Sequence, residues 1–273
     1  MNERSEMTTR TPGLRTLEHS YKKIYPFRLG TTSFIYPDLY SENVRLLGPY
    51  LDEIELLFFE SRDPGCFPST YEIDELLRLK NRWDLTYNIH LPTDVDLSSP
   101  DPHERETAVS NLEHVIEMTE PLKPVTYTLH IPFDSERPGG ETLWRAYASK
   151  GIRALLSRGV QSRKISVETL MYPPLLLKPL VDEFDLSICL DVGHVMLAGG
   201  DPLEVFREFR DRISIIHLHG VRNQSDHLSL DHFDAQDFSK IRHILNDFTE
   251  TVSIEVFSFK DLELSLSYLR ESF

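Results

Sequence analysis

The chain has 273 residues, of which 40% are hydrophobic and 27% are charged. This composition is typical of a globular protein and excludes a fibrous or wholly disordered chain, and no apolar run reaches the roughly 18 residues that cross a membrane. The formal net charge of −15 argues against a nucleic-acid partner, because proteins that bind phosphate backbones usually present a basic face.

The N-terminal segment is polar and contains no apolar stretch of the kind that a secretory signal requires. We interpret residues 1–26 as a loose leader and residues 27–273 as a single domain. The cysteines, Cys66 and Cys189, lie far apart in the sequence. A disulfide framework is therefore not expected, and a reducing cytoplasm is the default compartment.

From Arg28 onward, a short apolar run followed by a segment of helical periodicity occurs eight times. The predicted strands are 28–35, 52–59, 85–92, 125–132, 164–170, the start of 187–200, 213–220 and 251–258. The predicted helices are 40–51, 70–83, 101–122, 141–159, 174–184, 201–211, 234–248 and 259–272. Strands that alternate with helices are parallel, and eight such units predict a (β/α)8 TIM barrel. The alternative, an open doubly wound sheet, lacks the Gly-rich turn that would support it.

Polar side chains that could bind metal gather where the predicted strands end. They are His90, His130, Glu168, Asp191, His194, His217, His219, Asp226, His227 and Glu255. A single histidine in a strand is more often a hydrogen-bonded core residue, and a single glutamate there more often faces outward. Together, however, these residues converge from six strands on the end of the barrel that carries active sites.

Histidines and carboxylates in this mixture are typical ligands of a transition-metal ion. Without a cation, so many carboxylates would repel one another and raise each other's pKa values. The sequence therefore predicts that divalent metal ions bind at this end of the barrel. Zinc is favoured, and iron or manganese would also suit the ligands.

Several strings at these strand ends carry a family resemblance. They are "YNIHLP", "TLHIP", "SVETL", "CLDVGH", "HLHG" and "IEVF", in this order. In order and spacing they resemble the superfamily that holds the xylose-isomerase-like sugar isomerases and the zinc-dependent apurinic endonucleases (AP endonuclease family 2). The resemblance extends from Arg28 to about Phe257.

Within this superfamily, further strings resemble the cobamide-remodelling phosphodiesterases. They are "LGTTSFI", "DEIELLFFES", "DLTYNIHLP" and "DHLSL". This resemblance implies a hydrolase that cleaves the nucleotide-loop phosphodiester of cobamides, the corrinoids related to cobalamin, and releases cobinamide phosphate. The implied partner is a small corrinoid substrate, without nucleic acid or membrane, and no protein partner can be inferred.

The resemblance also implies roles for individual residues. Glu168 would bridge two metals, with His90 and His130 at the first of them. Asp191, His217 and Glu255 would complete the second metal site, and His194, Asp226 and His227 would hold a third. The superfamily pattern at the third site is Asp-x-His, whereas Asp226 and His227 are adjacent. His219 is a further candidate for the third site, and we assign it to substrate binding. We assign Glu168 and Glu255 as the catalytic residues.

The alternative reaction is isomerisation or epimerisation of a sugar or sugar phosphate. There Glu168 and Glu255 would face each other across one metal and move a proton next to a carbonyl group. This chemistry requires Glu168, Asp191, His217 and Glu255, but not the further histidines. A DNA-repair endonuclease is disfavoured by the net charge. A non-enzymatic corrinoid-binding module is disfavoured because no ligand position has been lost.

Overall fold

The computed structural model describes residues 15–62, 64–136 and 138–273. Eight parallel strands close into a barrel in the order β1-β10-β7-β6-β5-β4-β3-β2. The strands are β1 Arg28–Thr32, β2 Glu53–Leu57, β3 Thr86–His90, β4 Tyr127–Leu129, β5 Ile165–Glu168, β6 Ser187–Asp191, β7 Ile213–Leu218 and β10 Thr251–Ile254. The pairing of β1 with β10 closes the ring, so the predicted (β/α)8 barrel is confirmed and the open-sheet alternative is wrong.

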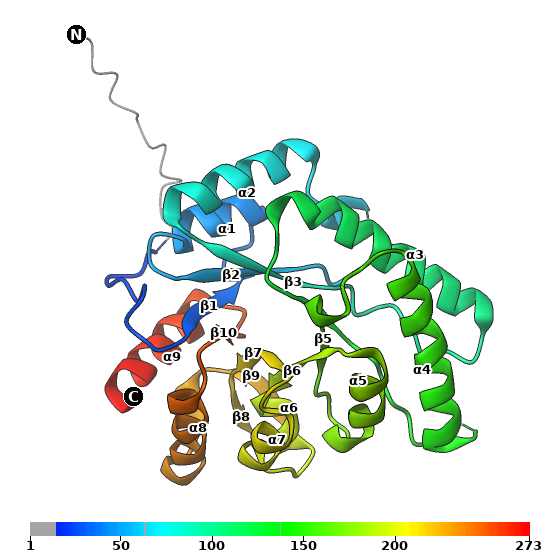
Figure 1. Ribbon diagram of the computed structural model, residues 1–273. Helices are drawn as coiled ribbons and strands as arrows, with labels where there is room; N and C mark the ends of the chain where they lie inside the picture. Colours follow the sequence, from blue (N-terminus) through cyan, green and yellow to red (C-terminus); the bar gives the residue numbers. More distant parts are fainter. Residues whose placement is uncertain (1–14, 63, 137) are drawn as a thin grey trace.

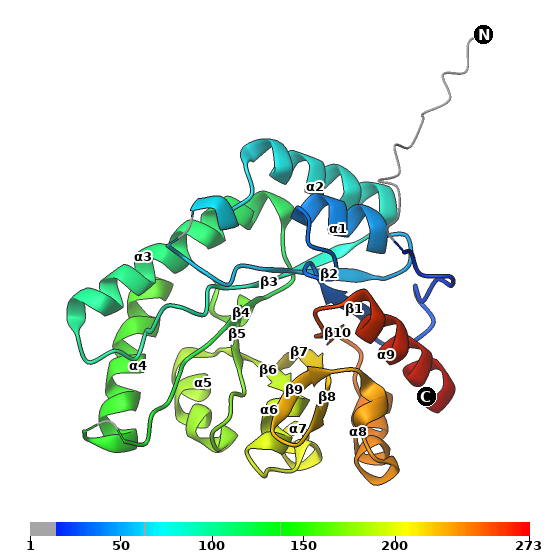
Figure 2. The same ribbon diagram turned by 180° about the vertical axis from the view of Figure 1, so that it is seen from behind.

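Helices surround the strands, as both ribbon views show (Figures 1 and 2). They are α1 Tyr40–Leu47, α2 Thr70–Trp83, α3 Pro102–Thr119, α4 Gly140–Ser157, α5 Lys178–Phe184, α6 Val192–Leu197, α7 Pro202–Phe209, α8 Ala235–Asp247 and α9 Phe259–Ser272. Short 3-10 helices lie at Pro64–Cys66, Glu120–Leu122, Ser162–Lys164, Pro174–Leu177 and Leu230–His232.

Local sequence signals explain where several helices begin. The side chains of Ser69, Asp101, Asp201, Asp234 and Ser258 accept hydrogen bonds from backbone N–H groups in the first turns of α2, α3, α7, α8 and α9. Each cap satisfies an N–H group that has no partner within its own helix. The helices therefore begin close to the predicted positions.

Two elements near the end of the barrel were not predicted. After Asp191 the chain turns directly into the short helix α6, and after β7 it forms a hairpin of β8 Gly220–Arg222 and β9 Ser225–Leu228. The hairpin turn consists of Asn223 and Gln224, both with positive φ, as a type I′ turn requires. The predicted loop that carries Asp226 and His227 is therefore a strand of this hairpin.

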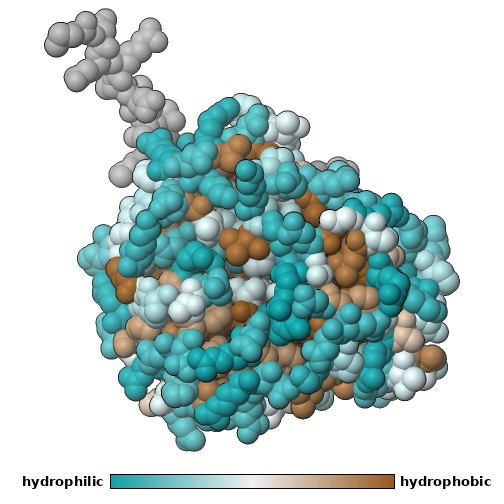
Figure 3. Space-filling model, viewed as in Figure 1, coloured by the Kyte–Doolittle hydropathy of each residue, from teal (hydrophilic) through white to brown (hydrophobic). Residues whose placement is uncertain are grey.

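The apolar core lies mainly between the strands and the helices, whereas much of the barrel interior is polar. Glu53, Asn88 and Thr251 are fully buried, and the side chains of Asn88 and Thr251 both donate hydrogen bonds to Glu53. Outside, hydrophilic residues cover most of the face seen in Figure 3, with hydrophobic side chains visible between them. In the part of the chain that is described, no helix is both long and apolar enough to cross a membrane.

The described part of the predicted leader packs against the barrel. Leu17 and Tyr21 are buried in the hydrophobic core, and the ring of Tyr25 stacks on that of Phe27. The rest of the predicted leader, residues 1–14, lies outside the described residues. The assignment of residues 1–26 as a separate leader remains a prediction.

Candidate metal centre

The predicted site residues on the strands lie at one end of the barrel, at or just beyond the carboxyl ends of these strands. His90, Glu168 and Asp191 are the last residues of β3, β5 and β6, and Asp191 is in register with His217 of β7. His130, His219 and Glu255 lie just beyond the ends of β4, β7 and β10. Because parallel strands present their carboxyl ends at the same mouth, residues up to 165 positions apart in the sequence meet there.

Glu168 lies at the centre of the first group. Its Oε2 atom is 3.2 Å from His90 Nε2 and 3.0 Å from His130 Nε2. Its other oxygen, Oε1, is 3.1 Å from His194 Nδ1. His90, His130 and Glu168 each offer a ligand atom within 4.8 Å of the others, so the structure brings together the residues predicted for the first metal.

The second group lies around the ring of His217. Its Nδ1 atom is 3.0 Å from Glu255 Oε2, 3.6 Å from Glu168 Oε2 and 3.9 Å from Asp191 Oδ2. All four side chains are almost completely buried. The three carboxylates thus converge on the same edge of one imidazole, which is the arrangement expected for the second metal.

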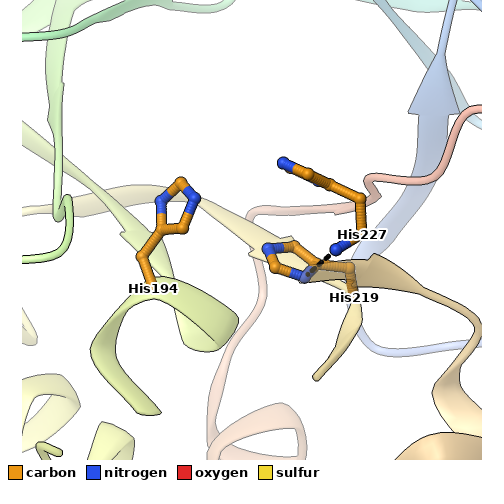
Figure 4. A group of neighbouring side chains, drawn as sticks. All are labelled: His194, His219 and His227. Carbon is orange, nitrogen blue, oxygen red and sulfur yellow. Dashed lines mark hydrogen bonds between the residues drawn. The ribbon is translucent and has the colours of Figure 1, made fainter. Parts of the chain in front are cut away.

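The third group contains the imidazoles of His194, His219 and His227 (Figure 4). Each ring offers one nitrogen atom that lies within 4.8 Å of those of the other two. Asp226 Oδ2 is 3.8 Å from His194 Nε2 and 3.9 Å from His227 Nε2. The hairpin therefore places the adjacent Asp226 and His227 beside His194. The departure from the Asp-x-His pattern does not separate these side chains.

The segment from Asp191 to His194 owes its shape to two local features. Asp191 caps α6, because its Oδ1 atom accepts a 2.6 Å hydrogen bond from the backbone N–H of His194. A Cβ atom at position 193 would lie 2.1 Å from Cε1 of His219, so only glycine leaves room for that ring. The sequence Asp-Val-Gly-His therefore positions Asp191 and His194, and its glycine leaves space for the ring of His219.

The ring of His219, which we assign to substrate binding, lies against Asp191. The ring is fully buried, and Nε2 lies 3.2 Å from each oxygen of Asp191. Nδ1 accepts a 2.9 Å hydrogen bond from the backbone N–H of His227 (Figure 4). His227 has a φ of 50°, an uncommon conformation for a residue with a side chain. In this arrangement His219 holds Asp191 in place.

Several buried polar atoms of the cluster have no hydrogen-bond partner among the described residues. They are His194 Nδ1, His217 Nδ1, Glu255 Oε2 and Glu55 Oε2. Each such atom costs about 1–3 kcal/mol, and folded proteins rarely leave them unpaired. His217 Nδ1 and Glu255 Oε2 face each other at 3.0 Å, and His194 Nδ1 lies 3.1 Å from Glu168 Oε1. Cations beside these atoms would supply the missing partners. The residues present therefore fit divalent metal ions.

The pKa values at the site follow from burial and from opposite charges. Burial raises the pKa of Glu168, but the surrounding imidazoles of His130, His194 and His90 outweigh this effect and lower its pKa well below the usual value. Burial lowers the pKa of His194, but the charges of Asp191 and Glu168 raise it to about 9. Without a cation, the carboxylates thus draw protons onto the histidines.

Two further members of the cluster lie outside the predicted ligand set. Glu55 of β2 lies 3.0 Å from His217 Nε2, and Cys189 of β6 offers its sulfur within 4.8 Å of Glu168 and His217. The side chain of Cys189 is fully buried. Burial also raises the pKa of its thiol well above the usual value. The alternation of strand β2 could have indicated Glu55, because Glu53 and Glu55 lie on the same face of that strand.

Comparison with known proteins places these observations in context. The model of the family described as xylose isomerase-like TIM barrel matches residues 44–272. Inosose dehydratase from Lacticaseibacillus casei is 41% identical over 59 residues. That match spans only 19% of this chain and 20% of the dehydratase.

Solved structures resemble the whole barrel. A D-tagatose 3-epimerase-like protein is similar with a TM-score of 0.74 at 19% identity, over 90% of this chain and 97% of that one. Endonuclease IV from Thermus thermophilus is similar with a TM-score of 0.69 at 20% identity, over 89% of this chain and 99% of that one. At these identities the likeness shows the fold alone.

Proposed function

The chain belongs to the xylose isomerase-like TIM barrel family, and from that premise we propose that it is a metal-dependent enzyme. The reaction that its geometry supports best is the hydrolysis of a phosphodiester. The observation that carries this proposal is the presence of further histidines beside the four residues Glu168, Asp191, His217 and Glu255. These histidines are His90 and His130 in one group, and His194 and His227 in another.

We assign the metal-holding residues as the sequence predicted them, with His219 as a support for Asp191. Bound divalent cations would activate a water molecule and neutralise charge on the phosphate oxygens. Glu168 could help to hold more than one cation, because its two oxygens face different histidines. Its lowered pKa keeps it ionised at neutral pH. The protein then needs no serine or cysteine nucleophile.

The second candidate reaction is isomerisation or epimerisation of a sugar, and the comparisons favour it over hydrolysis. The similar proteins include an inosose dehydratase and a D-tagatose 3-epimerase-like protein. The residues that this reaction requires are present, with Glu168 and Glu255 both beside His217. The two carboxylates could remove and return a proton next to a carbonyl group. This reaction leaves the His90–His130 pair and the His194–His227 group without a role.

The substrate proposed for hydrolysis is a cobamide, and this choice rests on the sequence resemblance of residues 29–35, 52–61, 84–92 and 226–230. A cobamide is a small ligand, so the net charge of −15 is no obstacle to its binding. Water would add its oxygen to the phosphorus of the nucleotide-loop phosphodiester, and the bond from phosphorus to the ribose oxygen would break. The nucleoside that carries the lower base would leave as the alcohol and take up a proton. Cobinamide phosphate would be the product.

One experiment compares the two reactions. Metal-loaded protein is incubated with adenosylcobalamin and, in parallel, with a panel of ketoses and aldoses. Mass spectrometry detects cobinamide phosphate, and NMR in D2O detects deuterium incorporated next to a sugar carbonyl. The variant Glu168→Gln serves as the inactive control for both arms. Cobinamide phosphate formed only by the wild type supports hydrolysis, whereas sugar conversion without it supports the second candidate.

A further inference from the structure

Glu55 is a buried carboxylate directly behind the metal centre. It lies in the middle of β2 with its side chain fully buried. Its Oε1 atom is 3.0 Å from His217 Nε2 and accepts a longer, 3.4 Å hydrogen bond from Thr128 Oγ1. A buried carboxylate in a strand interior is rare unless it is paired, so this contact with His217 requires an explanation.

The chemistry of the two groups fixes the orientation of the imidazole. A carboxylate can only accept hydrogen bonds, so Nε2 of His217 carries a proton. Nδ1 is then the nitrogen that faces Glu255 Oε2 at 3.0 Å and Glu168 Oε2 at 3.6 Å. Histidines that bind metals almost always donate their other N–H to a carboxylate, a carbonyl group or water, which fixes the ring and makes it a better ligand.

We propose that Glu55 is a positioning residue: by accepting the Nε2–H of His217, it holds Nδ1 towards the metal-binding carboxylates. The inference rests on the proposed metal-dependent function and assigns a role to a residue outside the predicted ligand set. Glu55 itself stays behind the ring of His217. It therefore acts through His217 and is not expected to touch the substrate.

Glu53 provides a matched control two residues earlier on the same strand. It is also fully buried, but its oxygens accept hydrogen bonds from Asn88, Thr86 and Thr251. Burial and the charge of Glu55 raise the pKa of Glu53 to about 8. Glu53 is therefore mostly neutral at pH 7, and glutamine is a close substitute for its neutral form.

The test measures metal affinity without reference to turnover. Metal-free wild type, Glu55→Gln and Glu53→Gln are titrated with Co²⁺, followed by its visible absorption, with Zn²⁺ competition as a second measurement. We expect Glu55→Gln to bind about 10–100-fold more weakly, and Glu53→Gln to bind like the wild type. Circular dichroism checks that each variant folds.

A second readout keeps the inference testable if Glu55→Gln does not fold. In Zn²⁺-loaded wild type, long-range ¹H–¹⁵N NMR shows which nitrogen of His217 carries the proton, with His217→Asn used for assignment. We expect the proton on Nε2, and a proton on Nδ1 would overturn the inference. Wild-type affinity in a folded Glu55→Gln variant would also overturn it while the proposed function stands. A wild type that binds neither metal would overturn both.

Discussion

Replacement of Gly193 by alanine tests whether the packing of His219 maintains the metal centre. The new Cβ atom would lie 2.1 Å from Cε1 of His219, and the ring would have to withdraw by about 1.3 Å to reach ordinary contact at 3.4 Å. That movement would break the 3.2 Å contacts between His219 Nε2 and Asp191. We therefore expect Asp191 to lose its support.

We expect Gly193→Ala to reduce the stability of the fold less than it reduces the activity of the site. Overpacking of a buried position costs about 1–3 kcal/mol, and alanine in place of glycine inside a helix returns up to about 1 kcal/mol. The free energy of unfolding should thus fall by about 1–2 kcal/mol, and by no more than about 3 kcal/mol. A misplacement of about 1 Å at a catalytic centre costs on the order of 100-fold in rate. We expect a loss of this order in kcat/KM, together with weaker binding of metal.

Gly151→Ala is the matched control for this experiment. Gly151 lies in α4, where an added Cβ would meet the carbonyl oxygen of Leu97 at 2.4 Å. This variant should be destabilised at least as much, because the obstacle is backbone, yet it should bind metal normally. Urea unfolding measures stability, and Zn²⁺ titration against a chelating indicator measures affinity. Normal metal affinity and normal turnover in folded Gly193→Ala would refute the reasoning, as would an equal loss of affinity in Gly151→Ala.

Three further predictions concern the metal and the charges around it. Protein expressed with supplemented metals should contain two or three equivalents of divalent cation by elemental analysis, and the absence of metal would count heavily against the site. Glu168→Gln should abolish turnover with an unchanged circular dichroism spectrum, whereas full activity would refute the bridging role. In metal-free protein, the raised pKa of His194, about 9, stabilises the fold fully below its ordinary pKa of about 6.5. This contribution is lost as the pH rises through about 9. The urea unfolding free energy with EDTA should therefore fall between these pH values, and a flat profile would contradict the assigned charge pairs.

The barrel could be predicted because its signal is repeated and local. Each unit pairs an apolar strand with an amphipathic helix, and eight such units leave few other topologies. The site could be predicted in part for the same reason, since parallel strands end at one mouth. His90, Glu168 and Asp191 occupy the last positions of their strands, where sequence spacing alone places them together.

What could not be predicted depends on contacts between side chains. The turn residues Asn223 and Gln224 favour a hairpin only weakly without glycine, so β8 and β9 were interpreted as a loop. The role of Gly193 depends on the ring of His219, which lies 26 residues further along the chain. Glu55 lies within its strand rather than at the end, and nothing in the sequence says that His217 faces it across the barrel.

The hydrogen-bond acceptors around His90 indicate which proton a bound cation would replace. Nδ1 of His90 is 2.9 Å from the carbonyl oxygen of Leu91, and Nε2 is 3.2 Å from Glu168 Oε2. Both partners are acceptors, so a purely hydrogen-bonded core would need a buried, doubly protonated imidazole. His217 presents the same difficulty between Glu55 and Glu255. Burial lowers the pKa of both rings, but the neighbouring acidic groups outweigh this effect and raise it. A cation beside each ring would take the place of one proton, and the acceptor behind the ring would then hold it as a ligand. The acceptors on both sides of these rings therefore fit a site in which a cation replaces one proton on each ring.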